Sequence, residues 1–420
     1  MIRLAGAVLA ACLTGCLAVP LFAQVVGGPA TQSPPNGPRQ NIGSSGGGLG
    51  ISLSLGGKKI PEPPLTGPAL DMRDRAMADY VPDQVLVFLE DPAAQPARIA
   101  KAAKVTVLAV SPLPELGVTM VVARLAIGDT PEQAMARLAK DPKVAWAQPD
   151  FNFQVLGNSR EQGAAISGIR IGPKHKVSGT IALIDSPVDI GNAALRGANI
   201  IQEGFGTALD PSSHGTAIAE ILVGTGAFAG VAQGARLFSL AAFAPVGEDW
   251  WRSQSSRLVL ALNRALALRP DVVNMSFGTA RDDPALARAL ARFEGLGTCV
   301  VAAAGNGGGG PVLFPGRDPR VVAVTAIDSS KKAYAYASHG PEIDVAAWGV
   351  RMNAAVPGGR RAVSGTSFAT AIVAGALLRG KPCGQQHNPA MMRAAVAAKA
   401  ADLGPKGRDS IFGAGLFRLP

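Results

Sequence analysis

Short apolar segments rich in β-branched residues recur between Tyr80 and Phe153 and predict strands. The predicted strands are 85–89, 105–110, 118–127 and 144–147. Helices are predicted at 97–104 and at 131–140, where Thr130-Pro131-Glu132 supplies an N-cap, a proline at the first position and an acid in the first turn. The order strand-helix-strand-strand-helix-strand is that of a small α+β fold of the ferredoxin-like type.

The longer region 168–420 alternates uniformly apolar strands with helical segments. The predicted strands are 180–184, 236–240, 272–276, 299–303 and 320–326. Helices are predicted after His214, at 256–268, at 284–295, after Ser367 and after Asn388-Pro389. Strands that are apolar at every position are buried on both faces, so the pattern predicts an α/β fold with a mostly parallel sheet flanked by helices.

The first 23 residues carry Arg3 and then an apolar run to Phe22, a pattern typical of an export signal. Two processing routes remain open: cleavage after Ala23, or lipidation at Cys16, where Leu13-Thr14-Gly15-Cys16 is similar to a bacterial lipobox. The protein is therefore expected in the periplasm or outside the cell, with a membrane tether only if Cys16 is lipidated. The segment 24–79 is rich in Gly, Pro and Ser and is predicted to be a linker.

Composition bears on the possible size of the core, on nucleic acid as a partner and on disulfide formation. The chain has 420 residues, enough for a large core, and a net charge of +10. Its Lys and Arg residues are scattered and lack interleaved aromatic residues, which argues against nucleic acid as a partner. Of the four cysteines, Cys12 and Cys16 lie in the signal. Cys299 and Cys383 could form a disulfide, or Cys299 could be an unpaired core thiol.

Four polar residues stand at or near the ends of predicted strands and the starts of predicted helices: Asp185, His214, Asn306 and Ser367. Each alone is explained by a turn or a helix cap. Together they provide what amide hydrolysis requires: a nucleophile, a base, a carboxylate that orients the base and an amide donor for the oxyanion. In open α/β sheets such residues meet beyond the carboxyl ends of the strands.

The order Asp, His, Ser and several surrounding motifs resemble the subtilisin-like serine proteases. The motifs are Ile181-Ala182-Leu183-Ile184-Asp185, His214-Gly215-Thr216, Val273-Asn274-Met275-Ser276-Phe277-Gly278, Ala303-Ala304-Gly305-Asn306 and Gly365-Thr366-Ser367-Phe368-Ala369. The resemblance covers most of Gly168 to Leu416. It implies that Ser367 is the nucleophile, His214 the base, Asp185 its orienting acid and Asn306 part of the oxyanion hole. The segment 80–153 resembles the inhibitory propeptides of the same family.

The resemblance also implies how substrate binds. Ser276, Phe277 and Gly278 are expected to form a strand that pairs with an extended peptide, and Ala303, Ala304 and Gly305 to line the pocket for the residue before the cut. These residues are small or apolar, which favours an uncharged or apolar residue there. No cofactor is required. Calcium is common in the family, but no oxygen-rich loop in this sequence marks a calcium site.

Two departures from the family pattern lie close to the predicted catalytic residues. Ser186-Pro187 follows Asp185 where the family usually has glycine in the second place, so the turn loses an N–H and gains a fixed φ. This predicts a displaced Asp185 loop. Glu220 stands where a glycine is usual in the His214 helix.

The sequence therefore predicts an exported serine endopeptidase, made as a zymogen that acts on proteins or peptides. Its own propeptide, 80–153, is the expected intramolecular inhibitor. Segment 154–167 would contain the maturation cleavage, and 168–420 would be the catalytic domain. The alternative is a catalytically silent pseudoprotease that keeps the fold as a binding or inhibitory module.

Overall fold

The computed structural model describes residues 79–419, apart from residues 92, 158–175, 227, 248–249 and 381–387. The predicted signal, including Cys16, and the predicted linker up to residue 78 lie outside the described residues. No helix within the described ranges is long and apolar enough to cross a membrane.

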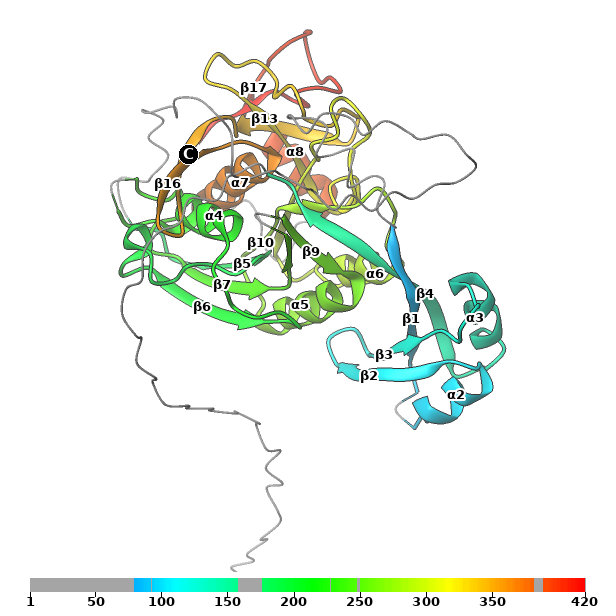
Figure 1. Ribbon diagram of the computed structural model, residues 1–420. Helices are drawn as coiled ribbons and strands as arrows, with labels where there is room; N and C mark the ends of the chain where they lie inside the picture. Colours follow the sequence, from blue (N-terminus) through cyan, green and yellow to red (C-terminus); the bar gives the residue numbers. More distant parts are fainter. Residues whose placement is uncertain are drawn as a thin grey trace, which may run out of the picture. The chain divides into compact units, whose positions relative to one another are not determined.

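A small α+β unit forms the first described part of the chain (Figure 1). Its elements are β1 (Tyr80–Leu89), α2 (Pro96–Ala102), β2 (Thr106–Leu113), β3 (Val118–Arg124), α3 (Pro131–Leu138) and β4 (Val144–Val155). The antiparallel strand order β2-β3-β1-β4 confirms the ferredoxin-like prediction. Thr130 caps α3 as predicted, and Gln133 completes the capping box by accepting a hydrogen bond from the Thr130 N–H at 3.0 Å.

The rest of the described chain is built on a nine-stranded sheet. In spatial order its strands are β17 (Ala400–Ala401), β18 (Leu416–Phe417), β14 (Ile343–Trp348), β13 (Val322–Ile327), β12 (Cys299–Ala303), β10 (Val272–Met275), β5 (Thr180–Asp185), β7 (Arg236–Ala241) and β6 (Asn199–Gly204). Every pairing from β18 to β6 is parallel, and only β17 runs antiparallel to its neighbour. The predicted mostly parallel sheet is confirmed.

Helices cover both faces of this sheet. Ile181 and Leu183 of β5 share a core with α4 (Ser213–Val223), α7 (Thr366–Gly380) and α8 (Pro389–Ala397). Ala182 and Ile184, which point the other way, share a core with α5 (Ser255–Leu268) and α6 (Pro284–Ala291). Because successive strand residues face opposite sides, two apolar faces require the uniformly apolar strands seen in the sequence.

Strand β4 joins the two parts of the fold. Residues 152–154 pair antiparallel with β9 (Trp250–Gln254), and residues 154–155 pair antiparallel with β11 (Phe277–Gly278). β9 also forms a hairpin with β8 (Ala244–Gly247), so β1–β4 and these strands make one seven-stranded sheet. The boundary that the sequence placed after Phe153 falls inside this strand.

The sheet of the α+β unit is covered on both faces. One face packs against α2 and α3 around Val87, Ile99 and Leu138. The other contributes Leu86, Phe88, Leu113, Met120 and Phe153 to the same core as α5 and α6. At its edge, Phe88 stacks on Trp146 with ring centroids 4.3 Å apart, and the Arg288 guanidinium lies 4.3 Å from the Trp146 ring centroid.

Cys299 lies at the start of β12 and is 1% exposed. It is disulfide-bonded, so the alternative of an unpaired core thiol is wrong. Cys383, the partner that the sequence suggests, lies outside the described residues.

An ion pair between the buried Glu220 and the partly exposed Arg360 joins α4 to a two-stranded hairpin, β15 (Met352–Val356) and β16 (Gly359–Val363). The Glu220 carboxylate is 3% exposed and accepts hydrogen bonds from Arg360 Nη1 at 2.7 Å and from the Ala355 N–H at 2.6 Å. Arg360 also lies 4.4 Å from the Phe228 ring centroid. The hairpin leads directly into α7, so the pair connects the helix that carries His214 to the segment before Ser367.

We expect Glu220→Gln to lower the free energy of unfolding by about 1–3 kcal/mol, because the buried Ala355 N–H and the Arg360 guanidinium lose a charged acceptor. The measurement is urea unfolding in a Ser367→Ala background, which avoids proteolysis. Glu203→Gln is the matched control, since Glu203 pairs with Arg264 at 2.8 Å but both side chains are partly exposed. That change should cost less than about 1 kcal/mol. Equal losses of unfolding free energy in Glu220→Gln and Glu203→Gln would contradict a special role for the Glu220 contacts.

Candidate active site

Asp185 and His214 form a buried pair at the carboxyl end of β5. Asp185 is the last residue of β5 and is 1% exposed; His214 lies in the first turn of α4 and is 4% exposed. His214 Nδ1 lies 2.8 Å from Asp185 Oδ1. An ionised carboxylate can only accept, so Nδ1 carries the proton and Nε2 of the neutral ring presents a lone pair.

The loop after Asp185 does not move the acid away from His214, so the displacement predicted from Ser186-Pro187 is wrong. Ser186 donates to Asp185 Oδ1 from its backbone N–H at 2.7 Å and from its hydroxyl at 2.8 Å. The Ser186 hydroxyl also lies 2.8 Å from the hydroxyl of Ser212, the N-cap of α4. These donors compensate for the N–H that Pro187 lacks and hold the turn against the His214 helix.

Ser367 is fully buried and is the second residue of α7. Its Oγ is hydrogen-bonded to the carbonyl oxygen of Leu156 and lies 3.0 Å from that of Ser276, while its backbone N–H donates to the Leu156 oxygen at 3.2 Å. The Ser276 hydroxyl in turn donates to the Ser367 carbonyl at 3.2 Å and accepts from Asn274. The amino end of α7 thus meets the Leu156 carbonyl, where a helix favours negative charge.

Asn306 lies beside the same carbonyl. Its Oδ1 accepts hydrogen bonds from the Thr366 backbone N–H at 3.2 Å and the Thr366 hydroxyl at 3.0 Å, which leaves Nδ2 facing the other way. A Cβ built on Gly365 would lie 2.6 Å from the Leu156 oxygen and 3.1 Å from Asn306 Nδ2. The oxygen and the amide nitrogen therefore flank one point, which only a glycine leaves open.

Leu156 reaches this position because β4 enters as a strand between two others. Val155 pairs with Phe277, and Gln154 pairs with both Gly278 and Arg252. Beyond the strand, the Leu156 N–H donates to the Ser276 carbonyl at 3.0 Å. Backbone pairing of this kind is how proteins bind extended peptides. Ser276, Phe277 and Gly278, predicted to pair with substrate, here pair with β4 of the same chain.

His214 borders the other side of the same peptide bond. A Cβ built on Gly157 would lie 3.0 Å from His214 Nε2. Nε2 is buried and has no hydrogen-bond partner among the described residues. Ser367 and His214 thus approach the Leu156–Gly157 bond from its two ends, while the Ser367 hydroxyl bonds to backbone carbonyls.

The pocket around the Leu156 side chain is partly the predicted one. Leu156 is 3% exposed. A Cβ on Gly278 would lie 3.0 Å from Leu156 Cδ1 and 2.9 Å from Leu313 Cβ, and one on Gly305 would lie 2.8 Å from Leu313 Cγ. Gly278, predicted as a pairing residue, therefore leaves room for Leu156 and Leu313, whereas Gly305, predicted to line the pocket, leaves room for Leu313. Ala303 and Ala304 are fully buried, and Ala304 packs in a core cluster with Val312 and Ile343.

Leu156, Gly157 and Leu313 were not assigned to the site from the sequence, although the first two lie within the predicted cleavage segment 154–167. The alternation Phe151, Phe153, Val155, followed at once by the apolar Leu156, would have extended the predicted strand beyond Ala147. Leu313 lies in a segment rich in Gly and Pro that carries no such signal.

Side chains of β4 also cap two helices of the large unit. Asp150 accepts from the Ser256 N–H and hydroxyl, both at 2.9 Å, at the start of α5. Gln148 accepts from the Ala285 N–H and donates to Asp283, the N-cap of α6, both at 2.9 Å. The α+β unit therefore accepts hydrogen bonds from the first turns of both helices, in addition to the cap that Asp283 itself provides for α6.

Burial raises the pKa of Asp150 from 3.8 to about 6, against the hydrogen bonds from Ser256 that favour the charged form. Asp283 raises this pKa further and Arg257 lowers it. Burial also raises the pKa of Asp283, which is hydrogen-bonded to Gln148 and Ser255. Two carboxyl groups thus face each other across the contact between β4 and the helices.

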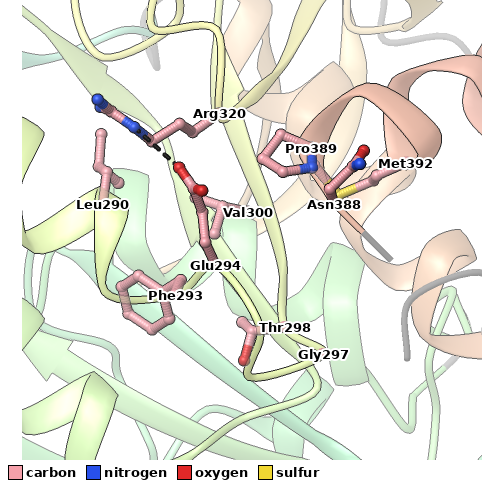
Figure 2. A pocket seen from close by; sticks show the side chains of 10 residues that line it. All are labelled: Leu290, Phe293, Glu294, Gly297, Thr298, Val300, Arg320, Asn388, Pro389 and Met392. Atoms are coloured by element: carbon pink, nitrogen blue, oxygen red, sulfur yellow. Dashed lines mark ion pairs between the residues drawn. The ribbon is translucent and has the colours of Figure 1, made fainter. Parts of the chain in front are cut away.

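A pocket outside this site lies between the end of α6 and α8 (Figure 2). Glu294 and Arg320 form an ion pair at 3.1 Å on one side, and Asn388, Pro389 and Met392 line the other. None of its lining residues belongs to the predicted site. Within the described ranges, no group of three or more His, Cys, Asp or Glu residues could hold a metal ion.

Comparison with protein families gives two matches. Residues 178–415 match the model described as the subtilase family, and residues 68–150 match the model described as the fervidolysin N-terminal prodomain. The first match contains Asp185, His214, Asn306 and Ser367, and the second covers most of the α+β unit.

Individual relatives agree with these matches. Subtilisin E of Bacillus subtilis is 33% identical over 261 residues, which cover 58% of this chain and 67% of that protein. The solved structure of fervidolysin from Fervidobacterium pennivorans, a keratinolytic enzyme related to subtilisin, has a TM-score of 0.67 at 21% identity and covers 81% of this chain and 60% of that one. The protease domain of PatA has a TM-score of 0.51 at 25% identity, covering 58% of this chain and 94% of that one.

The raised pKa of Asp150 predicts that the α+β unit binds more tightly in acid. A carboxyl group whose pKa is 3.8 when free and about 6 when bound takes up a proton on association, so affinity is lost as pH rises through about 6. From pH 7.5 to pH 5 the dissociation constant should fall by about tenfold. Calorimetry between the separate α+β unit and the remaining domain carrying Ser367→Ala measures it.

Asp150→Asn is the matched control, because it keeps the size and one acceptor but removes the titration. Its dissociation constant should change much less over the same pH range. A wild-type affinity that weakens toward pH 5 would contradict proton uptake by Asp150 on binding.

Proposed function

Because the chain belongs to the subtilase family, a family of serine endopeptidases, we propose that it hydrolyses peptide bonds through Ser367, His214 and Asp185. The observation that carries the proposal is the position of the Leu156–Gly157 bond. Its carbonyl oxygen accepts from the backbone N–H of Ser367, its carbonyl group meets the Ser367 hydroxyl, and its glycine borders His214.

Acyl transfer follows from this arrangement. The Ser367 hydroxyl turns from the carbonyls that it bonds and attacks the carbonyl carbon, while His214 Nε2 takes its proton. Asp185 holds the ring in the required tautomer and stabilises the imidazolium. His214 then gives the proton to the leaving amine, and water releases the acyl group by the same steps in reverse.

The negative oxygen of the intermediate would lie between the Ser367 N–H and Asn306 Nδ2. Thr366 supports both donors, because it is bonded to Asn306 Oδ1 through its N–H and its hydroxyl and immediately precedes Ser367. Donors fixed in this way need no reorganisation as charge develops. This is the role that we propose for Asn306.

We propose that the α+β unit is an intramolecular inhibitor and that its removal cuts the Leu156–Gly157 bond. This bond lies inside the segment 154–167 predicted from the sequence. The prodomain would then run from about residue 80 to Leu156, and the catalytic domain would begin at Gly157. The fervidolysin prodomain match and the pairing of β4 with β9 and β11 support this division.

We further propose that substrates are proteins or peptides with an apolar residue before the cut. Leu156 fills the room that Gly278 leaves beside Leu313, and Gly305 in turn leaves room for Leu313. Three residues earlier, Phe153 is 1% exposed and meets Phe277 edge to face at 5.9 Å. A charged residue at either place would lose its hydration without a partner.

The proposal places the mature enzyme outside the cytoplasm, on the strength of the predicted export signal in residues 1–23. Soluble export and a membrane tether at Cys16 both remain compatible with the site. It requires no cofactor, since each catalytic role has a side chain. The pseudoprotease alternative is disfavoured by the joint presence of Asp185, His214, Asn306 and Ser367 around one peptide bond.

We expect Ser367→Ala to abolish hydrolysis of peptide substrates and labelling by a fluorophosphonate probe, with a loss in kcat of about 10⁶-fold, the magnitude known for subtilisin. Asn306→Ala should keep labelling and lose about 10²–10³-fold in kcat. Circular dichroism checks that both variants fold. An intact, matured wild-type protein that neither reacts with the probe nor cleaves peptides would favour the pseudoprotease.

Maturation of the wild-type chain should produce a fragment whose first residue is Gly157, found by N-terminal sequencing or intact mass. Ser367→Ala should stay uncleaved when purified from a host without other proteases. Leu156→Asp should slow the cut by about tenfold or more, since a carboxylate would be buried beside Leu313. A mature N-terminus elsewhere, unaffected by Leu156→Asp, would contradict the assigned bond.

A further inference from the structure

We propose that this enzyme cleaves bonds followed by glycine, because His214 and Phe368 together occupy the space that any other residue after the cut would need. The inference rests on the proposed function and specifies its substrate class: peptides in which an apolar residue precedes glycine.

Gly157 lies close to two aromatic rings. A Cβ built on this residue would lie 2.9 Å from His214 Cδ2, 2.9 Å from Phe368 Cε2 and 3.0 Å from His214 Nε2. Ordinary carbon–carbon contacts are about 3.5–4.0 Å. A Cβ at this position would therefore clash with both rings. Both His214 and Phe368 would have to move to admit a side chain.

Neither ring is free to yield. His214 is 4% exposed and is held through Nδ1 by Asp185 at 2.8 Å. Phe368 is fully buried in the core that α4 and α7 share with the sheet, and its ring centroid lies 5.6 Å from that of His214. Close-packed rings of this kind resist displacement.

The backbone of the bond is also close to Gly365. A Cβ on Gly365 would lie 2.8 Å from Gly157 Cα and 2.6 Å from the Leu156 oxygen, so the chain passes as close to Gly365 as a glycine permits. The bond is thus closely surrounded by Gly365 and the two rings. A side chain after the cut would push His214 out of line with the nitrogen that it must protonate.

The chemistry makes this a limit on turnover as well as on binding. His214 must reach both the Ser367 hydroxyl and the leaving nitrogen, and a displacement of about 1 Å can cost about 10²-fold in rate. Glycine is the one residue that lets the ring keep its position. The restriction follows from Phe368, since a smaller side chain there would open the space beside His214.

The experiment uses internally quenched peptides that contain Phe-Gln-Val-Leu-Xaa, the sequence of residues 153–157 with Xaa as Gly, Ala or Val, and the full chain after its own maturation. We expect kcat/KM to fall by about tenfold or more from Gly to Ala, and further to Val. Phe368→Ala should reduce the ratio between the Gly and Val peptides. The matched control is Phe417→Ala, which truncates a phenylalanine of the same core and should leave the ratio unchanged.

The same test can be made within one chain, without added peptide. Gly157→Val should slow maturation of the full-length protein, and Gly157→Val combined with Phe368→Ala should recover part of the rate. Rescue of this kind separates crowding from misfolding, because truncating the buried Phe368 would only worsen a folding defect caused by Gly157→Val.

The outcomes are distinguishable from those of the proposed function. Fluorophosphonate labelling of Ser367 together with equal cleavage of the Gly and Val peptides would overturn the glycine restriction alone. A Gly-to-Val ratio that is unchanged in Phe368→Ala would overturn the role of Phe368. Absence of both labelling and cleavage of every peptide would overturn the proposed function, and the glycine restriction with it.

Discussion

The rest of the structure depends on the backbone hydrogen bonds that hold β4 between β9 and β11. These bonds do not depend on side chains, so they fix the path of the chain whatever its sequence, and Leu156 then meets Ser367 by geometry alone. The side chains add selectivity: Phe153 and Leu156 are almost fully buried, while Val155 between them is half-buried. The site thus contains a bound segment of the same chain, the end of β4 with Leu156.

A second set of contacts holds the α+β unit against α5 and α6. The α+β unit provides an apolar sheet face for α5 and α6 and, through Asp150 and Gln148, acceptors for the N–H groups at both helix ends. The apolar contact supplies most of the attraction, whereas the polar contacts fix the register of the strand. Asp150 makes that second contribution sensitive to protons, since its carboxyl is buried and faces Asp283.

Much of this could be predicted from the sequence. The parallel sheet followed from strands that are apolar at every position, and the ferredoxin-like order from alternation and the Thr130 cap. Asp185, His214, Asn306 and Ser367 could be singled out because they supply the groups that amide hydrolysis needs and because their order and motifs resemble the subtilisin-like proteases. The sequence could not reveal that the Ser186 hydroxyl would meet that of Ser212, that Leu313 would lie against Gly278, or that the end of β4 would lie beside Ser367 and His214. Each of these depends on contacts between residues far apart in the chain, and local patterns carry no trace of such contacts.

Strand β4 has one further consequence, which concerns time. Hydrolysis of a single peptide bond after Leu156 removes none of the ladder that joins β4 to β9 and β11. If this bond is the one that is cut, the two products would stay together through that ladder, and the delay before activity would be set by how often the small α+β unit opens. That unit has a core of its own around Val87, Ile99 and Leu138, on the face turned away from the enzyme. Packing in this remote core would then set the time between cleavage and activity. Weaker packing there would shorten that time without changing any residue of the active site.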